Sequence, residues 1–357
     1  MSTTTTTALL ASMLFIGCAP IGEPGRARTT DAGSGSGSGS DLTCDTVATE
    51  TMDIDFTSTG SASIPTGCWK LDGKLTIGGS VTSLAKLGDL RGVTDLVINA
   101  SQLTALDTPN PIAVTNSITI ENNTKLTDLT NLSVPTDTSC SAYLASVSVT
   151  GNTMLTDLGA VSQIACISGA TTIQNNAQLA TIDLANATRL EGGLTIESNA
   201  MLTSIELPML TSVTEGITIK GNALLTSLGA WSQLMFVHGS LTIDTNAALT
   251  TLEGVMPTTS IMIEGALTIT NNAKLTEVGE FDHLTGAETI DVSNNASLDY
   301  CEAREIGCCV PDSDPQNVAT AQIAANKTTT CTGASSWCYA PDGNKCHNDY
   351  TGYTGTL

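Results

Sequence analysis

A twelve-residue pattern recurs through the middle of the chain and limits what it can fold into. Its clearest copies begin at Leu194 (LTIESNAMLTSI), Ile217 (ITIKGNALLTSL), Leu241 (LTIDTNAALTTL) and Leu267 (LTITNNAKLTEV). The shared element Ile/Val-x-x-Asn-x-x-Leu occurs eight times from residue 118 onward, with a period near 24 residues. A fixed period in the twenties is typical of a solenoid, in which each turn stacks on the previous one.

Each position of the repeat has a physical role in such a stack. Leu194 and Ile196 alternate with Thr195, as on a strand whose apolar side chains point inward. The asparagine that follows suits a turn, and an inward amide can bond to backbone groups of the adjacent turns. We therefore expect a buried ladder of asparagines, formed by Asn123, Asn152, Asn176, Asn199, Asn222, Asn246, Asn272 and Asn295.

Two degenerate copies, from Lys74 and Asp95, precede these eight and bring the total to about ten turns. Apolar residues make up 41% of the chain but aromatic residues only 3%, so the core must be aliphatic. The formal net charge of −22 argues against binding nucleic acid or anionic headgroups. We expect no cofactor, because no metal-binding loop of fixed spacing occurs in the chain.

The N-terminus has the features of an export signal. Residues 8–17 (ALLASMLFIG) are too short an apolar run to span a bilayer but suit a signal peptide. The stretch LFIGCAP resembles a bacterial lipoprotein signal, which implies a signal peptide at 1–17 and lipid on Cys18. Residues 18–43 include TTDAGSGSGSGSD, a flexible Ser/Gly tether. An ordinary cleaved signal peptide with an incidental Cys18 is the alternative.

The repeat resembles that of receptor L-domains, a leucine-rich-repeat-like family also found in bacterial surface lipoproteins. The resemblance covers roughly residues 66–331, from GCWKLDGKLTI to beyond NNASLDYCEAREI. It implies a mainly β, right-handed β-solenoid with disulfide-capped ends. It also implies a lipid-anchored protein of the bacterial outer membrane or cell surface that recognises or adheres to a protein or glycan.

The cysteines predict how the ends and one loop are crosslinked. An exported chain with 11 cysteines, one of them lipidated, has ten left for disulfides. Cys44 and Cys68 bracket an N-terminal cap on a solenoid spanning residues 44–300, and Cys140 and Cys166 lie one period apart. We expect a Cys-rich cap at 301–357, in which Cys301 pairs with Cys331 where stacking stops and CEAREIGCC forms a helical lid. The pairing of Cys308, Cys309, Cys338 and Cys346 stays open, with Cys338–Cys346 suggested by proximity.

Catalytic or metal chemistry finds little support in the residue pattern. Only His238, His283 and His347 occur, and they share no position of the repeat. His347 stands beside Cys346, but the chain has no Cys-x-x-Cys pair for zinc. An acidic row at Glu121, Glu197 and Asp244 is interrupted, and we interpret it as a solvated face rather than a polysaccharide-degrading site; the interrupting residues are Gln174, Lys220 and Thr270.

Exposed hydroxyls form the most regular surface feature. One column is Thr119, Ser148, Thr172, Thr195, Thr218, Thr242 and Thr268, ending at Asp291, and a second is Thr127, Thr156, Thr203, Thr226, Thr250 and Thr276. Such arrays are similar to those of ice-binding solenoids, but the Thr-x-Thr ranks of those proteins are missing. We interpret the columns as ordinary exposed strand residues. Trp231, Met235 and Phe236 are interpreted as packing at a loop corner of the core, with a ligand contact as the alternative.

These features predict a non-catalytic recognition module held at a membrane by its N-terminal lipid. The alternatives are a passive structural component of the cell envelope, an ice-binding protein and a polysaccharide-active β-helix.

Overall fold

The fold is that of a computed structural model of the chain. The structure describes residues 47–57, 64–255, 261–279, 281, 284–299, 303, 306, 320–324, 326–327, 337–339 and 345–347. Residues from Cys44 onward form one compact unit. The predicted signal peptide, Cys18 and the tether lie outside the described residues. Within the described ranges, no helix is both long and apolar enough to cross a membrane.

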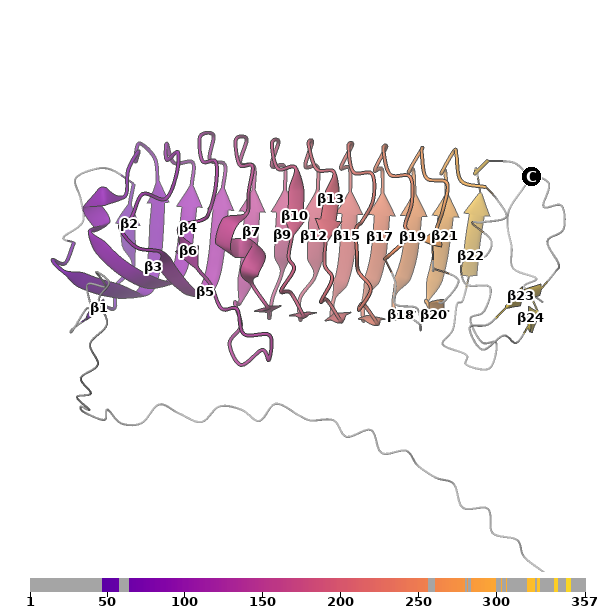
Figure 1. The fold of residues 1–357 in the computed structure, drawn as a ribbon, viewed down its shortest axis with the longest axis horizontal. Helices are drawn as coiled ribbons and strands as arrows, with labels where there is room; N and C mark the ends of the chain where they lie inside the picture. The colour runs from indigo at the N-terminus through magenta and orange to yellow at the C-terminus, as the bar shows by residue number, and fades with distance from the viewer. Residues whose placement is uncertain are drawn as a thin grey trace, which may run out of the picture. The chain divides into compact units, whose positions relative to one another are not determined.

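The chain forms a mainly β solenoid of about ten turns, as the repeat predicts (Figure 1). Successive turns contribute parallel strands to one long sheet. The strands along this first sheet are β1 (Ala48–Glu50), β3 (Cys68–Gly78), β4 (Asp89–Asn99), β5 (Ile112–Glu121), β7 (Ser146–Thr150), β9 (Thr171–Gln174), β12 (Leu194–Glu197), β15 (Gly216–Lys220), β17 (Ser240–Asp244), β19 (Ala266–Thr270), β21 (Thr289–Ser293) and β22 (Thr320–Ala324). In addition, β2 (Ile54–Phe56) pairs with β3, and β6 (Leu132–Ser133) pairs with β5.

A second parallel sheet forms another side of the same solenoid. Its strands are β8 (Cys166–Ile167), β11 (Arg189–Leu190), β14 (Ser212–Val213), β16 (Phe236–Val237), β18 (Ile261–Ile263) and β20 (Leu284–Gly286). The other elements are β10 (Thr181–Asp183), β13 (Ser204–Glu206), β23 (Trp337–Tyr339), β24 (Lys345–His347) and the 3-10 helices η1 (Ala85–Leu87) and η2 (Gly159–Gln163).

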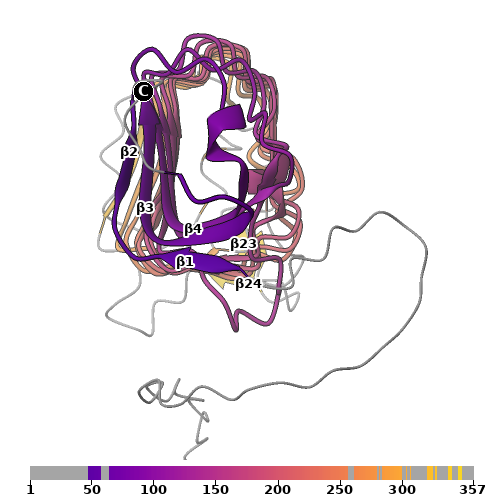
Figure 2. The ribbon, with the colours of Figure 1, turned by 90° about the vertical axis from the view of Figure 1, so that its left-hand side faces the viewer.

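The first turns join these two sides directly. Strands β3 and β4 bend from one side of the cross-section to the next (Figure 2), and their pairing register slips between Leu71 and Lys74. We call the outward face of β5, β7, β9, β12, β15, β17, β19 and β21 the first wall. We call the outward face of the second sheet, together with the first halves of β3, β4 and β5, the second wall. Leu144 bridges to Ile167 and connects the two parts of the second wall.

Stacking in register explains why the same residue types recur. Leu194 pairs with Ile217, Ile217 with Leu241, and Leu241 with Leu267, each nearly inaccessible to solvent. Each inward position therefore rests on its equivalent one turn away, and only similar aliphatic volumes fill the column without gaps. The low aromatic content of the sequence follows from this requirement.

The eight predicted ladder asparagines are all completely buried and bonded in sequence. From Asn152 onward the side-chain Oδ1 accepts the backbone N–H of the preceding asparagine, as Asn222 does from Asn199 at 2.9 Å, and Asn123 Oδ1 accepts the N–H of Ser101. The Nδ2 group donates to a strand carbonyl, such as that of Ile196 for Asn222 at 3.0 Å. Both polar ends of every amide are thus satisfied, which buried amides require.

The residue just before each rung adopts left-handed backbone geometry. This position has φ of 56° at Asn122 and Asn175 and 65° at Gly221, but the less suited Ser198 and Thr245 also adopt it, at 57° and 59°. A positive φ is uncommon for residues other than glycine and a genuine outlier for a β-branched one. The turn is therefore imposed by the ladder rather than by local preference at Thr245.

The predicted end of the solenoid at residue 300 is wrong. Strand β22 extends the first sheet beyond β21, and Asn326 adds a further rung by accepting the Asn295 N–H at 3.0 Å. The sequence hid this turn because its interval is 31 residues and Thr329 stands where the repeat has a leucine, three residues after the asparagine. Of the predicted helical lid, Ala303 is helical. The remainder of that segment, except Ile306, lies outside the described residues.

One predicted crosslink is present in full. Cys140 and Cys166 form a disulfide with a Cα–Cα distance of 5.5 Å. Cys68 is disulfide-bonded, whereas its predicted partner Cys44 lies outside the described residues. Cys338 and Cys346 stand directly opposite each other in the antiparallel pair β23–β24. Cys301, Cys308, Cys309 and Cys331 are outside the described residues.

Candidate recognition surface

The first wall is flat and chemically uniform. Its central hydroxyl column stands in strict register from Thr119 on β5 to Thr268 on β19. Gly193, Gly216 and Ser240 line one side of this column. Among the described residues, the column threonines make no side-chain hydrogen bond. The wall therefore offers a regular polar surface.

The acidic row beside this column is an edge whose carboxylates are bonded to neighbouring turns. Lys220 pairs with Asp244 on the next turn at 3.2 Å, and Gln174 donates to Glu197 at 3.3 Å. Burial opposes ionisation of Asp244, but donors from Asn271, Thr270 and Lys220 outweigh it and hold the pKa of this carboxyl below its usual value. The row has the charge pattern expected of a solvated face rather than of paired catalytic acids.

The second threonine column is not a free hydroxyl surface. Thr203 Oγ1 donates to the carbonyl of Ala180 at 3.0 Å, and the backbone N–H of Thr203 donates to the same oxygen at 2.9 Å. Thr226 repeats this arrangement on the carbonyl of Thr203. These hydroxyls tie neighbouring turns together, so this column serves stacking.

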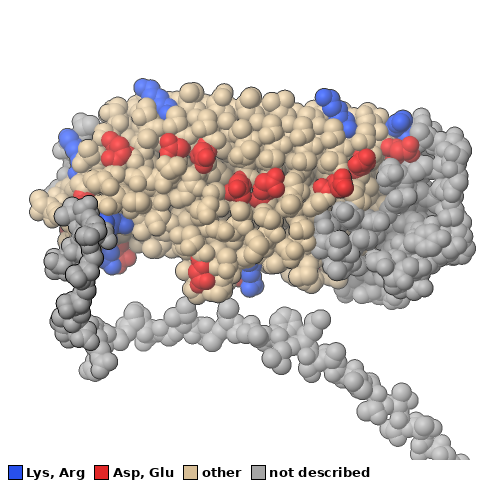
Figure 3. All heavy atoms as spheres, viewed as in Figure 1, with Lys and Arg blue, Asp and Glu red and all other residues tan. Residues whose placement is uncertain are grey.

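Acidic residues gather along the side of the solenoid that carries β10 and β13. Figure 3 shows them as a row along the length of the molecule. Asp183 and Glu206 stand directly opposite each other on adjacent turns of this side. Among the described residues, no group of three metal-binding side chains comes together. The row gives this side of the solenoid a negative charge.

The second wall departs from this regularity at its aromatic spot. Trp231 is buried and its Nε1 donates to the carbonyl of Ile205 at 3.1 Å, as expected for a core corner. Met235 and Phe236 were expected there too, and that expectation is wrong: they are 42% and 41% exposed. Phe236 alternates with the inward Val237 on β16, so its ring must point outward.

Phe236 belongs to a small apolar cluster that crosses turns. Its ring stacks on that of His238 with centroids 6.0 Å apart, and Met262 faces it from β18. His238 Nδ1 lies 2.9 Å from Glu264 Oε1, which fixes the imidazole beside the ring. His347 lies in β24, and His283 is outside the described residues.

A stapled loop projects from the same wall. Residues 134–143 leave after β6 and return at Leu144, below η2 in Figure 1, and the Cys140–Cys166 disulfide fastens them to β8. Within the loop, hydroxyl donors from Ser141 and Ser139 lower the pKa of Asp137 to about 2. The carboxylate therefore holds the loop in a turn at neutral pH.

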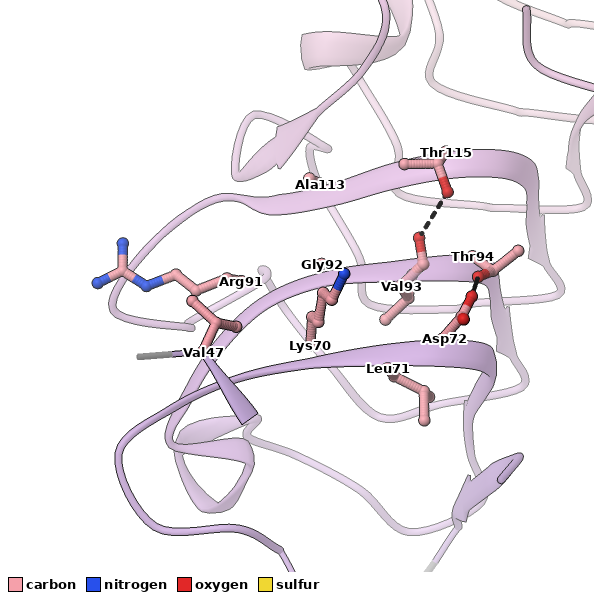
Figure 4. Close-up of a pocket in the computed structure, with 10 residues that line it drawn as sticks. All are labelled: Val47, Lys70, Leu71, Asp72, Arg91, Gly92, Val93, Thr94, Ala113 and Thr115. Atoms are coloured by element: carbon pink, nitrogen blue, oxygen red, sulfur yellow. Dashed lines mark hydrogen bonds between the residues drawn. The ribbon is translucent and has the colours of Figure 1, made fainter. Parts of the chain in front are cut away.

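The third departure is a groove of about 390 Å³ at the start of the second wall (Figure 4). It is lined by Val47, Lys70, Leu71, Asp72, Arg91, Gly92, Val93, Thr94, Ala113 and Thr115. Lys70, Gly92 and Ala113 stand side by side in register across β3, β4 and β5. The floor is low because Gly92 and Ala113 have almost no side chain.

The charged side chains around the groove differ in whether another side chain already pairs with them. Arg91 Nε lies 2.8 Å from Asp89 Oδ1 and its Nη2 lies 3.1 Å from Oδ2, so the two groups neutralise each other. Asp72 accepts a hydrogen bond from Thr94 at 3.2 Å. Lys70 is exposed and forms no ion pair within the described part of the chain.

The sequence did not single out this groove. Most of its residues lie just before the two degenerate copies that begin at Lys74 and Asp95, where departures from the repeat look like erosion of the pattern. A usable signal was the clustering of Lys70, Lys74, Lys86 and Arg91 within a strongly acidic chain. No family model, curated protein or solved structure matches the chain, so a functional proposal rests on these residues alone.

Proposed function

We propose that this protein is a lipid-anchored lipoprotein facing away from the cytoplasm. Its solenoid would act as a non-catalytic recognition or adhesion module for a protein or glycan. The supporting observation is the exposed cluster of Met235, Phe236 and Met262 on the second wall. The anchor would be lipid on Cys18, on a bacterial outer membrane or cell surface.

Stacking does not require these apolar side chains. The position of Phe236 is occupied by Arg189 and Ser212 on the two preceding turns, so a polar residue is fully compatible with the fold there. An aromatic residue and methionines exposed together on a protein of strongly negative net charge are typical of a contact surface. Aromatic and methionine residues are also enriched where binding energy is concentrated.

The tether fits such a role. A Ser/Gly-rich segment of residues 18–43 would have a root-mean-square span of about 28 Å, by the scaling for flexible linkers. That span would let the solenoid turn any wall toward a partner on a neighbouring surface. The rival reading, a passive envelope component, needs neither the tether nor the exposed cluster.

The anchor is tested by feeding host cells a labelled fatty-acid analogue and comparing the natural protein with the variant Cys18→Ser. Label on the natural protein alone is expected. Protease added to intact cells should then clip the tether if the solenoid faces outward. A labelled protein that resists protease would place the module in the periplasm, and absence of label would overturn the anchor.

Recognition is tested by binding of purified protein to intact host and neighbouring cells. The double variant Phe236→Ser/Met262→Ser should lose most binding, whereas the first-wall control Thr218→Ser/Thr242→Ser should retain it. Both pairs lie on adjacent turns of known register. Equal binding by the two variants, or no binding by the natural protein, would favour the passive component.

A further inference from the structure

We propose that the groove across β3, β4 and β5 binds a carboxylate-bearing sugar, with the ammonium of Lys70 contacting the carboxylate. The proposal rests on the recognition function above and specifies a ligand class for one part of the second wall. It is supported by the shape of the groove, by which of its charged side chains are already paired, and by the pairing of its strands.

Charge is the first reason. Arg91 forms an ion pair with Asp89, which also accepts a hydrogen bond from Asn110 at 2.7 Å, so the charges of Arg91 and Asp89 neutralise each other. Lys70 is the cation of the groove that keeps its charge available, because none of the described residues forms an ion pair with it. An ammonium beside a low-dielectric recess attracts a carboxylate, and a charge-assisted hydrogen bond strengthens the contact.

Shape is the second reason. The volume of about 390 Å³ falls at the lower end of the range for small-ligand sites. A Cβ added to Gly92 would lie 3.1 Å from the carbonyl oxygen and 3.3 Å from the Cβ of Ala113, so a side chain at this position would crowd Ala113, and glycine keeps the floor low. A flat ligand can therefore lie over Gly92 and Ala113, and the C–H face of a pyranose ring is flat and weakly apolar.

The rim supplies the polar partners that sugar hydroxyls require. Thr94 and Asp72 are joined on one side, and Thr115 donates to the carbonyl of Val93 at 3.5 Å, a bond long enough to be exchanged for a ligand (Figure 4). Val47, at the open side, is 42% exposed and adds an apolar edge. A ring carrying hydroxyls and one carboxylate therefore finds a partner for each chemical group.

An acidic peptide is the competing ligand, and the strand pairing disfavours it. Extended peptides bind β-proteins by adding to an unpaired sheet edge. Here β4 is paired on both sides, with β3 and β5, so the groove floor lies inside a sheet. No row of free backbone donors and acceptors is offered along β4.

The test is calorimetric titration of the purified full-length protein with trigalacturonate at low salt. Maltotriose serves as the neutral sugar and triglutamate as the acidic peptide. Trigalacturonate should bind, and Lys70→Gln should weaken the binding about tenfold or more, because the charge-assisted contact with the carboxylate is lost. Lys125→Gln, which removes the same charge from another turn, should leave the affinity unchanged.

Several outcomes would overturn the proposal. These are equal affinity for maltotriose, equal Lys70-dependent affinity for triglutamate, an unchanged affinity in Lys70→Gln, or no binding of trigalacturonate. Failure here is separable from failure of the recognition function. If Lys70→Gln protein still adheres to cells through Phe236 and Met262, the module stands and only the sugar site is lost.

Discussion

The two walls of this solenoid are built from the same repeat but differ in how regularly their outward residues recur from turn to turn. On the first wall, strands of four or five residues stack turn after turn, and the outward positions repeat almost unchanged from Thr172 to Thr268. On the second wall the strands are mostly two or three residues long, and a groove, a stapled loop and an apolar cluster interrupt it.

This difference shows where such a fold can accept new chemistry. Long paired strands restrict the residues on both faces of the sheet. Neighbouring strands in a sheet lie about 4.7–4.9 Å apart, so every substituted side chain must pack against the side chains of the adjacent turns. Shorter strands leave more residues free of pairing, so insertions such as 134–143 are tolerated. We therefore expect stability to depend on the ladder and first sheet, and recognition on the second wall.

The largest stability effect should come from the ladder. Asn222→Ala removes the acceptor for Asn199 and the donor to Ile196, leaving buried polar groups unpaired. Each such group costs about 1–3 kcal/mol, so a loss of about 3–5 kcal/mol is expected. The midpoint of urea unfolding, followed by circular dichroism, measures it. Asn186→Ala, whose amide bonds to Gln163 near the surface, should change the midpoint little; equal shifts would refute a special role for the ladder.

The disulfide should come next. Replacing Cys140 and Cys166 together by Ser frees the loop 134–143, and closing a loop of this size stabilises a protein by about 2–4 kcal/mol. We expect a lower unfolding midpoint and faster proteolysis within the loop. An unchanged proteolysis rate would mean that the Asp137 turn alone orders this part of the second wall.

A stabilising substitution is expected at the turn before one rung. Thr245→Asn replaces a β-branched residue at φ 59° by the residue type found there at Asn122 and Asn175. Relief of left-handed strain should raise stability by about 1 kcal/mol. The same change at Thr242, in the extended strand β17, should not stabilise. A fall in the unfolding midpoint of Thr245→Asn would show that the Thr245 side chain contributes more than its strain costs.

The smallest expected effect is a difference in stability loss between two threonines of the same turn, one from each column. Thr203→Val loses a hydroxyl donor to Ala180, for which about 0.5–1.5 kcal/mol is expected. Thr195→Val loses a hydroxyl with no partner among the described residues and should change stability by less than about 0.5 kcal/mol. Equal losses in thermal unfolding would contradict the distinction between a stacking column and a free one.

The sequence predicted the solenoid, its turns, the asparagine ladder and the Cys140–Cys166 crosslink because each follows from the period. The sequence did not predict the parts of the molecule that depart from the 24-residue period. The turn ending at Asn326 was missed because its 31-residue interval lacks the following leucine, and the groove was missed because Gly92 and Ala113 look like erosion of a repeat. Exposure of Phe236 could not be read from composition, because only strand alternation against Val237 determines its direction.

The most direct test of the division between walls is hydroxyl-radical footprinting of the protein bound to intact cells, read out by mass spectrometry. Hydroxyl radicals oxidise methionine and phenylalanine side chains readily, and the protein has such exposed residues both on the second wall and away from it. Met235, Phe236 and Met262 report on the second wall. Met154 and Met201, 48% and 44% exposed in the turns after the ladder, report on surface away from it. We predict protection of the first three with unchanged oxidation of the last two. Equal protection of both groups, or protection of Met154 and Met201 alone, would contradict recognition through the second wall.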